Sequence, residues 1–287
     1  MCSEDNKIKR KIGSCHRSIH DENELRMSQM LLNKAPIDLI DYPNYFNLMK
    51  EYPLNVKNQF NQGCCAGMAL SVLRESFLKD KEKELSPAFL YWQSRVYEGE
   101  DVNQDTGICL KSGLETLKRY GICEEEYMKF DSNIWNQPPS EEAYSNAKIY
   151  KIDTYINLDN GISGIKSYLY SKKKPVIFGM EIYDGFIKGT GKDGIVPVPN
   201  QDEKPLDGHS ALIIGYKDNT FKDNLISLFN KKRSKYGYFI VLNSYGKDFG
   251  KQGLYFLPYE YLLFNKAYDF YVITTKNNLN YQLDKGG

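Results

Sequence analysis

The stretch VKNQFNQGCCA, residues 56–66, leads into a regular run of apolar residues and is the most informative part of this chain. Apolar side chains recur at positions 68, 69, 72, 73 and 77, which places them on one stripe of a helix from Cys65 to about Lys79. A thiol in the first turn of a helix meets unpaired backbone N–H groups and the positive end of the helix dipole, and both favour the thiolate. Small residues at 63, 66 and 67 leave this thiol sterically open. The stretch therefore predicts a nucleophilic cysteine; the alternative is that Cys64 and Cys65 are two small buried side chains.

The helices and strands expected from the rest of the chain are unevenly distributed. One helix begins at the N-cap Ser86 with Pro87 in its first turn, another carries leucines at 110, 114 and 117 and ends at Gly121, and a third lies near Ile165. Runs of β-branched and aromatic residues predict strands at 174–182, 211–216, 236–243, 253–257 and 269–274. Helices in the first half and strands in the second indicate an α+β chain with two lobes.

Composition excludes several classes of protein. The chain has 287 residues, 41% hydrophobic and 14% aromatic, which is too apolar for a disordered chain. Its 38 basic and 37 acidic residues leave a net charge of +1, so we expect no nucleic-acid partner. No apolar run reaches the roughly 18 residues of a membrane helix, and the first residues do not resemble a signal peptide, so we expect no membrane partner. Six cysteines in a chain of this length do not indicate a disulfide scaffold.

Histidine supplies the second candidate for chemistry. Two of the three histidines, His16 and His20, lie in the first 35 residues, so the body of the chain holds only His209, in the sequence DGHSALIIGY. A lone histidine before a strand is usually a structural residue with hydrogen-bond partners. Set beside Cys65, it can instead stabilise a thiolate and pass a proton to a leaving amine.

Three segments, in this order, resemble the papain-like cysteine proteases. Residues 56–66 are similar to their nucleophile segment, residues 207–216 to their histidine strand, and residues 243–253 (NSYGKDFGKQG) to their Asn-Ser-Trp-Gly segment. His209 lies 144 positions after Cys65, which fits the spacing of the family. The similarity extends over about residues 36–275 and is closest in pattern to bacterial and large-DNA-virus cathepsin B-like members.

The resemblance implies a catalytic role for four residues. Cys65 would attack the peptide carbonyl, and His209 would keep it ionised and then act as general acid. Asn243 would orient the imidazole through its far ring nitrogen, as the third member of a triad does. Gln59 would donate a side-chain N–H to the oxyanion, with the backbone N–H of Cys65 as the second donor.

The same resemblance suggests where a substrate would bind. Gly107 is a candidate for the backbone strand that pairs with an extended peptide. Gly63 and Ser210 flank the expected nucleophile and histidine, and Tyr245 stands where the family has a Trp that shields the Asn–His bond from water. The family often has a cysteine three positions before the nucleophile, in a disulfide with the loop near Gly107. Here that position is Gln62, so the bridge cannot form.

The resemblance also implies the architecture: an α+β papain-like fold with a helical lobe, a β-barrel-like lobe and the cleft between them. We expect an arm at 1–35, a helical lobe with the nucleophile at 36–145, and a β-rich lobe with His and Asn at 146–287. The implied function is a monomeric cysteine peptidase that cleaves peptide or protein substrates without metal or cofactor, in the cytoplasm or associated with a virion. The alternatives are a catalytically silent peptide-binding protein and another Cys/His acyl transferase, such as a transglutaminase or an amidase.

The first 35 residues differ from the rest of the chain. Five basic side chains lie within residues 7–17, and the segment is much shorter than the usual helical prosegment of papain-like enzymes. Two interpretations remain: a short propeptide or regulatory arm, which would make the chain a zymogen, and a solvated tail. Zinc ligation by Cys2, Cys15, His16 and His20 is disfavoured by their spacing and the lack of a strand–helix frame.

Overall fold

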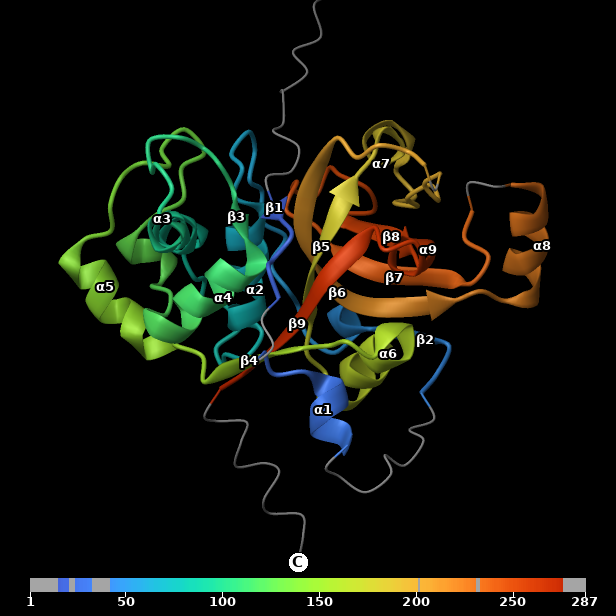
Figure 1. Ribbon diagram of the computed structural model, residues 1–287, viewed down its shortest axis with the longest axis horizontal. Helices are drawn as coiled ribbons and strands as arrows, with labels where there is room; N and C mark the ends of the chain where they lie inside the picture. The colour runs from blue at the N-terminus through green and yellow to red at the C-terminus, as the bar shows by residue number, and fades with distance from the viewer. Residues whose placement is uncertain (1–14, 21–23, 33–41, 201, 231–232, 276–287) are drawn as a thin grey trace, which may run out of the picture.

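The computed structural model describes residues 15–20, 24–32, 42–200, 202–230 and 233–275. Two groups of elements lie side by side, with helices α3, α4 and α5 on one side, the sheet on the other and strand β1 between them (Figure 1). The helices are α1 (Met27–Leu32), α2 (Cys65–Glu75), α3 (Pro87–Glu98), α4 (Leu110–Arg119), α5 (Glu141–Ala147), α6 (Gly161–Lys172), α7 (Asp184–Gly189), α8 (Phe221–Phe229) and α9 (Glu260–Leu263). Short 3-10 turns are η1 (Leu48–Lys50), η2 (Glu125–Tyr127) and η3 (Lys148–Tyr150). The strands are β1 (Cys15–His16), β2 (Tyr45–Asn47), β3 (Ile108–Cys109), β4 (Thr154–Asn157), β5 (Val176–Ile182), β6 (Asp207–Asp218), β7 (Gly237–Leu242), β8 (Leu254–Pro258) and β9 (Ala267–Thr274).

The expected helices form, and their ends follow local chemistry. The hydroxyl of Ser86 accepts a hydrogen bond from the Phe89 N–H at 3.1 Å, Pro87 occupies the first turn of α3, and Gly99 ends the helix in the left-handed conformation with φ 76°. Every residue of α2 is buried, because this helix lies in the centre of the molecule and packs against β6 as well as α3 and α4. The nucleophile segment is therefore held by the core.

The second lobe is built on one mainly antiparallel sheet with the order β4-β9-β5-β6-β7-β8, to which β2 adds beside β6. The path runs from β4 to β8 without closing, so the β-barrel-like lobe expected from the resemblance is instead an open sheet in the described residues. Strand β2 comes from the segment assigned to the helical lobe, which means that this segment crosses over to complete the sheet. The α+β class is confirmed.

Five helices of the described residues were not predicted from the sequence: α1, α5, α7, α8 and α9. Helix α5 has only seven residues, and α8 lies in an insertion between β6 and β7. Thr220 and Asp223 form a capping box at the start of α8, a signal that the sequence does carry. Helices α6 to α9 all belong to the second lobe, so helices are not confined to the first half of the chain.

Candidate active site

Cys65 is the first residue of α2, and Cys64 is its N-cap without a side-chain capping bond. Both thiols are fully buried. The Cys65 thiol accepts hydrogen bonds from the backbone N–H groups of Ser210 and Ala66. Because Ser210 follows His209 directly on β6, this contact brings the nucleophile of the first lobe to the histidine strand of the second.

His209 and Asn243 form the second part of the site. The imidazole Nε2 lies 2.8 Å from the Asn243 Oδ1, and both side chains are buried. The Tyr245 ring packs on the imidazole with a centroid distance of 4.9 Å, and its hydroxyl lies 3.4 Å from Nδ1. Tyr245 thus covers the histidine as expected from its position in the sequence and adds a polar atom that a Trp would not supply there.

Burial controls the ionisation of this pair. Burial raises the pKa of the Cys65 thiol to about 12, although the N–H groups of Ser210 and Ala66 lower it. Burial likewise lowers the pKa of the His209 imidazole to about 4, although the hydrogen bond with Asn243 raises this pKa in part. Near pH 7 the thiol and the imidazole are therefore both neutral, which is the resting rather than the reactive state of a cysteine–histidine pair.

Gln59 is held at the junction of the two lobes. Its Nε2 donates to the Gln62 carbonyl at 3.0 Å, and its Oε1 accepts from the Ser244 hydroxyl at 2.6 Å. Its backbone N–H also donates to the Ser244 carbonyl at 2.8 Å. A carboxamide has two N–H donors, so one remains for another acceptor.

Of the residues expected to bind substrate, Ser210 is engaged inside the sheet. The Ser210 hydroxyl is buried and donates to the Phe178 carbonyl at 3.1 Å. Ser210 therefore contacts the site through its backbone N–H, which donates to the Cys65 thiol. Gly107 has φ 83°, a left-handed conformation that favours glycine, and directly precedes β3. Its backbone N–H donates to the Tyr91 hydroxyl at 3.1 Å.

Asp105 joins the loop before the nucleophile to the loop before β3. Both of its carboxylate oxygens lie 3.0 Å from the N–H of Gly63, and the Tyr91 hydroxyl donates to Oδ1 at 2.5 Å. Through Tyr91 the network continues to Gly107. These hydrogen bonds connect the two segments that a disulfide joins in many papain-like enzymes and that Gln62 leaves unbridged here.

Residues 42–261 match the model of the papain family of cysteine proteases. The chain belongs to this family. An uncharacterized peptidase C1-like protein of Acanthamoeba polyphaga mimivirus is 29% identical over 198 residues, and the match spans 66% of this chain and 58% of that protein's length.

Solved structures show the same fold as this papain-family chain. Xylellain, a cysteine protease from Xylella fastidiosa, superposes with a TM-score of 0.76 at 24% identity, over 93% of this chain and 98% of that one. Digestive procathepsin L2 proteinase from Tenebrio molitor larval midgut gives a TM-score of 0.68 at 17% identity, over 92% of this chain and 78% of the other. The name procathepsin identifies the second of these structures as that of a proenzyme.

In this papain-family chain, the N-terminal arm lies against the site. Strand β1 (Cys15–His16) pairs in parallel with β3 and also contacts β6, which places the arm between the two lobes. A Cβ on Gly208, beside the histidine, would lie 1.9 Å from the Cys15 carbonyl oxygen, so a larger residue there would displace the arm. Burial first, and then the nearby Cys65, raise the pKa of the Cys15 thiol. Within the described part of the arm, Cys15, Ser18 and Glu24 are buried, whereas the side chains of residues 16, 17, 19 and 20 are exposed.

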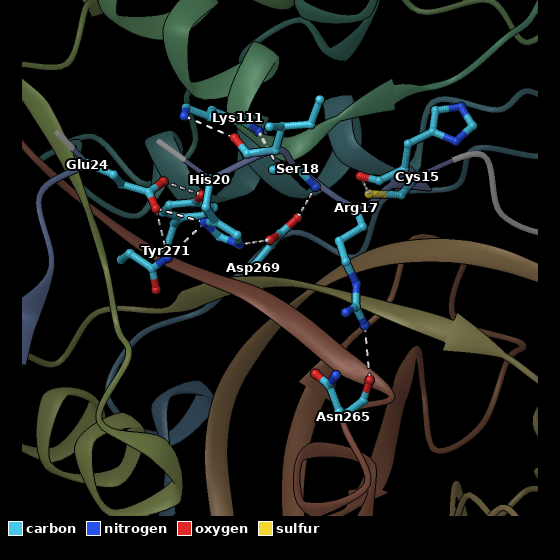
Figure 2. A network of polar contacts seen from close by, with 12 residues as sticks. Cys15, Arg17, Ser18, His20, Glu24, Lys111, Asn265, Asp269 and Tyr271 are labelled. Carbon is cyan, nitrogen blue, oxygen red and sulfur yellow. Dashed lines mark hydrogen bonds and ion pairs between the residues drawn. The ribbon is translucent and has the colours of Figure 1, made fainter. Parts of the chain in front are cut away.

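A polar network, which we name the arm clamp (Ser18, His20, Glu24 and Asp269), holds the arm on β9 (Figure 2). The Ser18 N–H donates to Asp269 Oδ2 at 2.7 Å, and the two ring nitrogens of His20 lie 3.1 Å from Asp269 Oδ1 and 2.8 Å from Glu24 Oε2. Glu24 also accepts from the Tyr271 hydroxyl at 2.5 Å. Asp269 has φ 56°, a left-handed backbone, at the irregular part of β9.

Further contacts tie the arm to both lobes. The Arg17 guanidinium donates to the Asn265 carbonyl at 3.0 Å and lies 4.3 Å from the centroid of the Tyr268 ring. On the other side, Lys111 at the start of α4 donates two hydrogen bonds to the arm. Its backbone N–H donates to the Ser18 hydroxyl, and its Nζ donates to the Ile19 carbonyl. The arm therefore bridges the helical lobe and the sheet, as Figure 2 shows.

Sequence reasoning proposed Cys65, His209 and Asn243 as the site but did not identify the residues that surround and connect them in the structure. Asp105 lies 42 positions from Gly63, and Asp269 lies 251 positions from Ser18, so no local pattern connects either pair. Over the described parts of the chain, no three His, Cys, Asp or Glu side chains are grouped so as to hold a metal ion. In the same residues, no helix combines the length and apolarity needed to cross a bilayer.

Proposed function

We propose that this chain is a cysteine peptidase that hydrolyses peptide bonds through a thioester on Cys65. The observation that carries the proposal is the contact of Cys65, the first residue of a buried helix, with the backbone N–H of Ser210, which directly follows His209 on β6; the His209 imidazole in turn lies 2.8 Å from Asn243. Membership of the papain family supports the same chemistry.

In the proposed reaction the Cys65 proton passes to His209, and the thiolate attacks the carbonyl carbon of the scissile bond. The oxyanion accepts hydrogen bonds from the Cys65 N–H and from the second N–H of the Gln59 carboxamide. His209 returns its proton to the leaving amine, the C–N bond breaks and a thioester remains. Water, deprotonated by His209, then attacks the thioester and releases the acid and the free thiol.

We further propose that the full chain is a latent form, a zymogen in which residues 1–35 are the inhibitory segment. The arm takes the position beside β3 that an extended substrate would use, next to Gly107. The neutral Cys65–His209 pair under the arm supports this assignment, because the thiolate is the reactive species.

The nucleophile is tested by two single substitutions in a chain that begins at Pro36. Cys65→Ala should lower kcat/KM for a fluorogenic peptide by about 10⁵-fold, as loss of a nucleophile does in other proteases. Cys64→Ala should retain most of the activity, because the adjacent thiol has no role in the reaction. The reverse pattern would move the nucleophile to Cys64.

Two experiments separate the alternatives. A thiol-directed epoxide should label Cys65 rapidly in the chain that begins at Pro36; absence of labelling and of hydrolysis together would favour a silent peptide-binding protein. Hydrolysis should continue when a primary amine is added in excess; amide formation at the expense of hydrolysis would instead indicate an acyl transferase.

The latent form is tested by comparing the full chain with the chain that begins at Pro36. The shorter chain should cleave the peptide faster, because its Cys65 is open to substrate. Equal rates would remove the inhibitory role of the arm without touching the proposed chemistry.

A further inference from the structure

Helix α8 (Phe221–Phe229) presents its apolar side chains outward. Ser227 is only 5% exposed, and Asp223 is turned to the N-cap Thr220. In contrast, Phe221 is 80% and Leu228 is 72% exposed. Leu225 and Ile226 are exposed as well. A surface helix of a soluble domain normally buries its apolar stripe, so this helix has the opposite orientation.

The helix stands at the edge of the molecule, on the side opposite to helices α3, α4 and α5 (Figure 1). A cavity of about 260 Å³ lies at its base, lined among others by Ile226, Tyr238 of β7 and Phe256 of β8. Just before the helix, the Asn219 N–H donates to the carbonyl of Tyr236, whose own ring is 57% exposed.

The surroundings of this apolar face are basic. Four basic residues accompany it in the described residues of the segment 217–236: Lys217, Lys222, Arg233 and Lys235. The two acidic residues of the same segment are engaged, since Asp223 caps the helix and Asp218 lies 2.5 Å from Lys166. In the sequence, two more lysines stand at 231 and 232, outside the described residues. Lys217 and Arg233 are themselves paired, with Asp223 at 3.7 Å and Asp193 at 3.5 Å, so Lys222 and Lys235 are the described basic residues of the segment for which no such ion pair is found. The segment still carries six basic and two acidic residues in a chain whose net charge is only +1.

Charge and shape together select the partner. A second copy of the chain would bring the same positive charges against each other, which opposes self-association through this face. A protruding helix with apolar side chains outward and lysines beside them has the composition of helices that lie in the interface of an anionic bilayer. Lysine stems can extend along such an apolar face while their ammonium groups reach acidic headgroups.

We propose that α8 binds the surface of membranes that contain anionic lipids, with Phe221, Leu225 and Leu228 entering the interface and Lys222 and Lys235 on the headgroups. The sequence alone led us to expect no membrane partner, because that expectation rested on the lack of a membrane-spanning run. A surface contact needs no such run. The site is remote from Cys65, so this proposal does not depend on peptidase activity.

The test is flotation of the full chain with vesicles of phosphatidylcholine containing about 30% phosphatidylserine, an anionic lipid that recruits basic surfaces. The Cys65→Ala background prevents self-cleavage. We expect binding to these vesicles, at least tenfold weaker binding to phosphatidylcholine alone, and weakening by salt. Phe221→Ser/Leu228→Ser and Lys222→Glu/Lys235→Glu should each reduce the partition coefficient about tenfold.

A matched control replaces an exposed apolar residue elsewhere. Ile149→Ser changes a side chain that is 67% exposed in the 3-10 turn η3, and it should bind vesicles like the unchanged chain. Thermal melting of each variant confirms that it is folded. Lack of binding to the anionic vesicles, or equal binding by the α8 variants and Ile149→Ser, would overturn the proposal. Binding to poly-glutamate in place of vesicles, with the same loss in the α8 variants, would overturn it in favour of an acidic protein partner.

Discussion

The His209 imidazole is fixed on both of its nitrogens. Asn243 holds Nε2 at 2.8 Å, and the Tyr245 hydroxyl lies 3.4 Å from Nδ1. The Tyr245 ring is in turn packed edge-on against Phe249 at 5.2 Å. In a triad the residue that orients the imidazole determines which nitrogen carries the proton, so these contacts select the tautomer available to Cys65.

Replacing the two neighbours of His209 should have different effects. Asn243→Ala leaves Nε2 without its acceptor, and we expect a fall in kcat of about 10²-fold or more, as for loss of the third member of other triads. Tyr245→Phe keeps the ring and removes only the hydroxyl. Its effect should be below about tenfold, since a 3.4 Å contact is a weak hydrogen bond.

Both variants are measured by the pH dependence of kcat and KM in the chain that begins at Pro36. Tyr245→Phe should leave KM unchanged and move only the pH limbs of kcat. An effect of Tyr245→Phe as large as that of Asn243→Ala would show that the hydroxyl takes part in proton transfer, contrary to the mechanism given above.

At the scale of elements, the loop that precedes α2 and the loop that precedes β3 are held together by Asp105. Its carboxylate receives the Gly63 N–H and the Tyr91 hydroxyl. Hydrogen bonds to a charged acceptor stabilise more than neutral ones. This network can serve in a reducing compartment, where a disulfide in the same place would not persist.

Loss of that connection should destabilise the first lobe. We expect Asp105→Asn to lower the free energy of unfolding by about 1–3 kcal/mol, because a neutral amide accepts less strongly and adds a donor beside the Gly63 N–H. Urea denaturation of the chain that begins at Pro36 measures this change in the free energy of unfolding. Asp101→Asn in the same loop is the control, since Asp101 is exposed and binds only Asn103 and Gln104 nearby. Equal changes in the two variants would contradict the role of Asp105.

The arm clamp is the second device at the scale of elements. It joins a segment near the N-terminus to the last strand of the sheet, through Asp269 and Glu24. Because β9 pairs with β5, next to the histidine strand, the clamp acts directly beside the site. Weakening the clamp should therefore release the arm without touching Cys65.

In the full chain, we expect His20→Ala and Asp269→Asn each to raise peptide cleavage about tenfold, the effect of losing about one hydrogen bond to a charged group. In the chain that begins at Pro36, Asp269→Asn should have no effect on the rate. His16→Ala is the control in the full chain, because the His16 side chain is exposed and its ring lies 3.2 Å from the Thr106 carbonyl, outside the arm clamp. Rates that rise equally in all variants would argue against a specific clamp.

At the scale of the whole molecule, seating of the arm is linked to pH. Burial holds the pKa of His209 at about 4 under the arm, whereas an exposed imidazole takes up its proton near 6.5. Acidification from about pH 6.5 to 4 therefore favours the open form, which binds the proton first. Burial raises the pKa of Glu24, but hydrogen bonds from Tyr271, His20 and Asn157 lower it overall, which acts in the same direction. Burial raises the pKa of Asp269 in the closed form, and this shift opposes the opening of the arm on acidification.

Between pH 7 and 5 the equilibrium should shift toward the open form by about 20-fold from His209 alone. Hydrogen exchange of the Ser18 amide in the full chain with Cys65→Ala, corrected for its intrinsic pH dependence, follows this opening. The additional change His209→Gln removes the titrating group and should flatten the dependence. Unchanged protection at pH 5 would show that the arm does not open with acid.

Local patterns in the sequence predict the structure only of the segments in which they occur. Helix α2 and the capped start of α3 follow from apolar spacing and from Ser86-Pro87, and His209 stands out as the one histidine of the body. Asp105 and Asp269 could not be found in this way, because each acts on a backbone N–H that only folding brings near. The exposure of the apolar face of α8 could not be predicted either, because an apolar stripe on a helix does not show whether that face points to the core or to solvent.

The order of side chains along the chain thus accounts for the α+β class and for the choice of Cys65, His209 and Asn243 as candidates, because periodicity and short motifs act over a few residues at a time. The open sheet, the seat of the arm between the lobes and the neutral state of the Cys65–His209 pair arise only in the folded molecule. The physical reason is that strand pairing and burial join segments far apart in the sequence, 93 residues for Cys15 and Ile108 and 145 for Cys65 and Ser210. The same thiol and imidazole ionise differently once those segments exclude water.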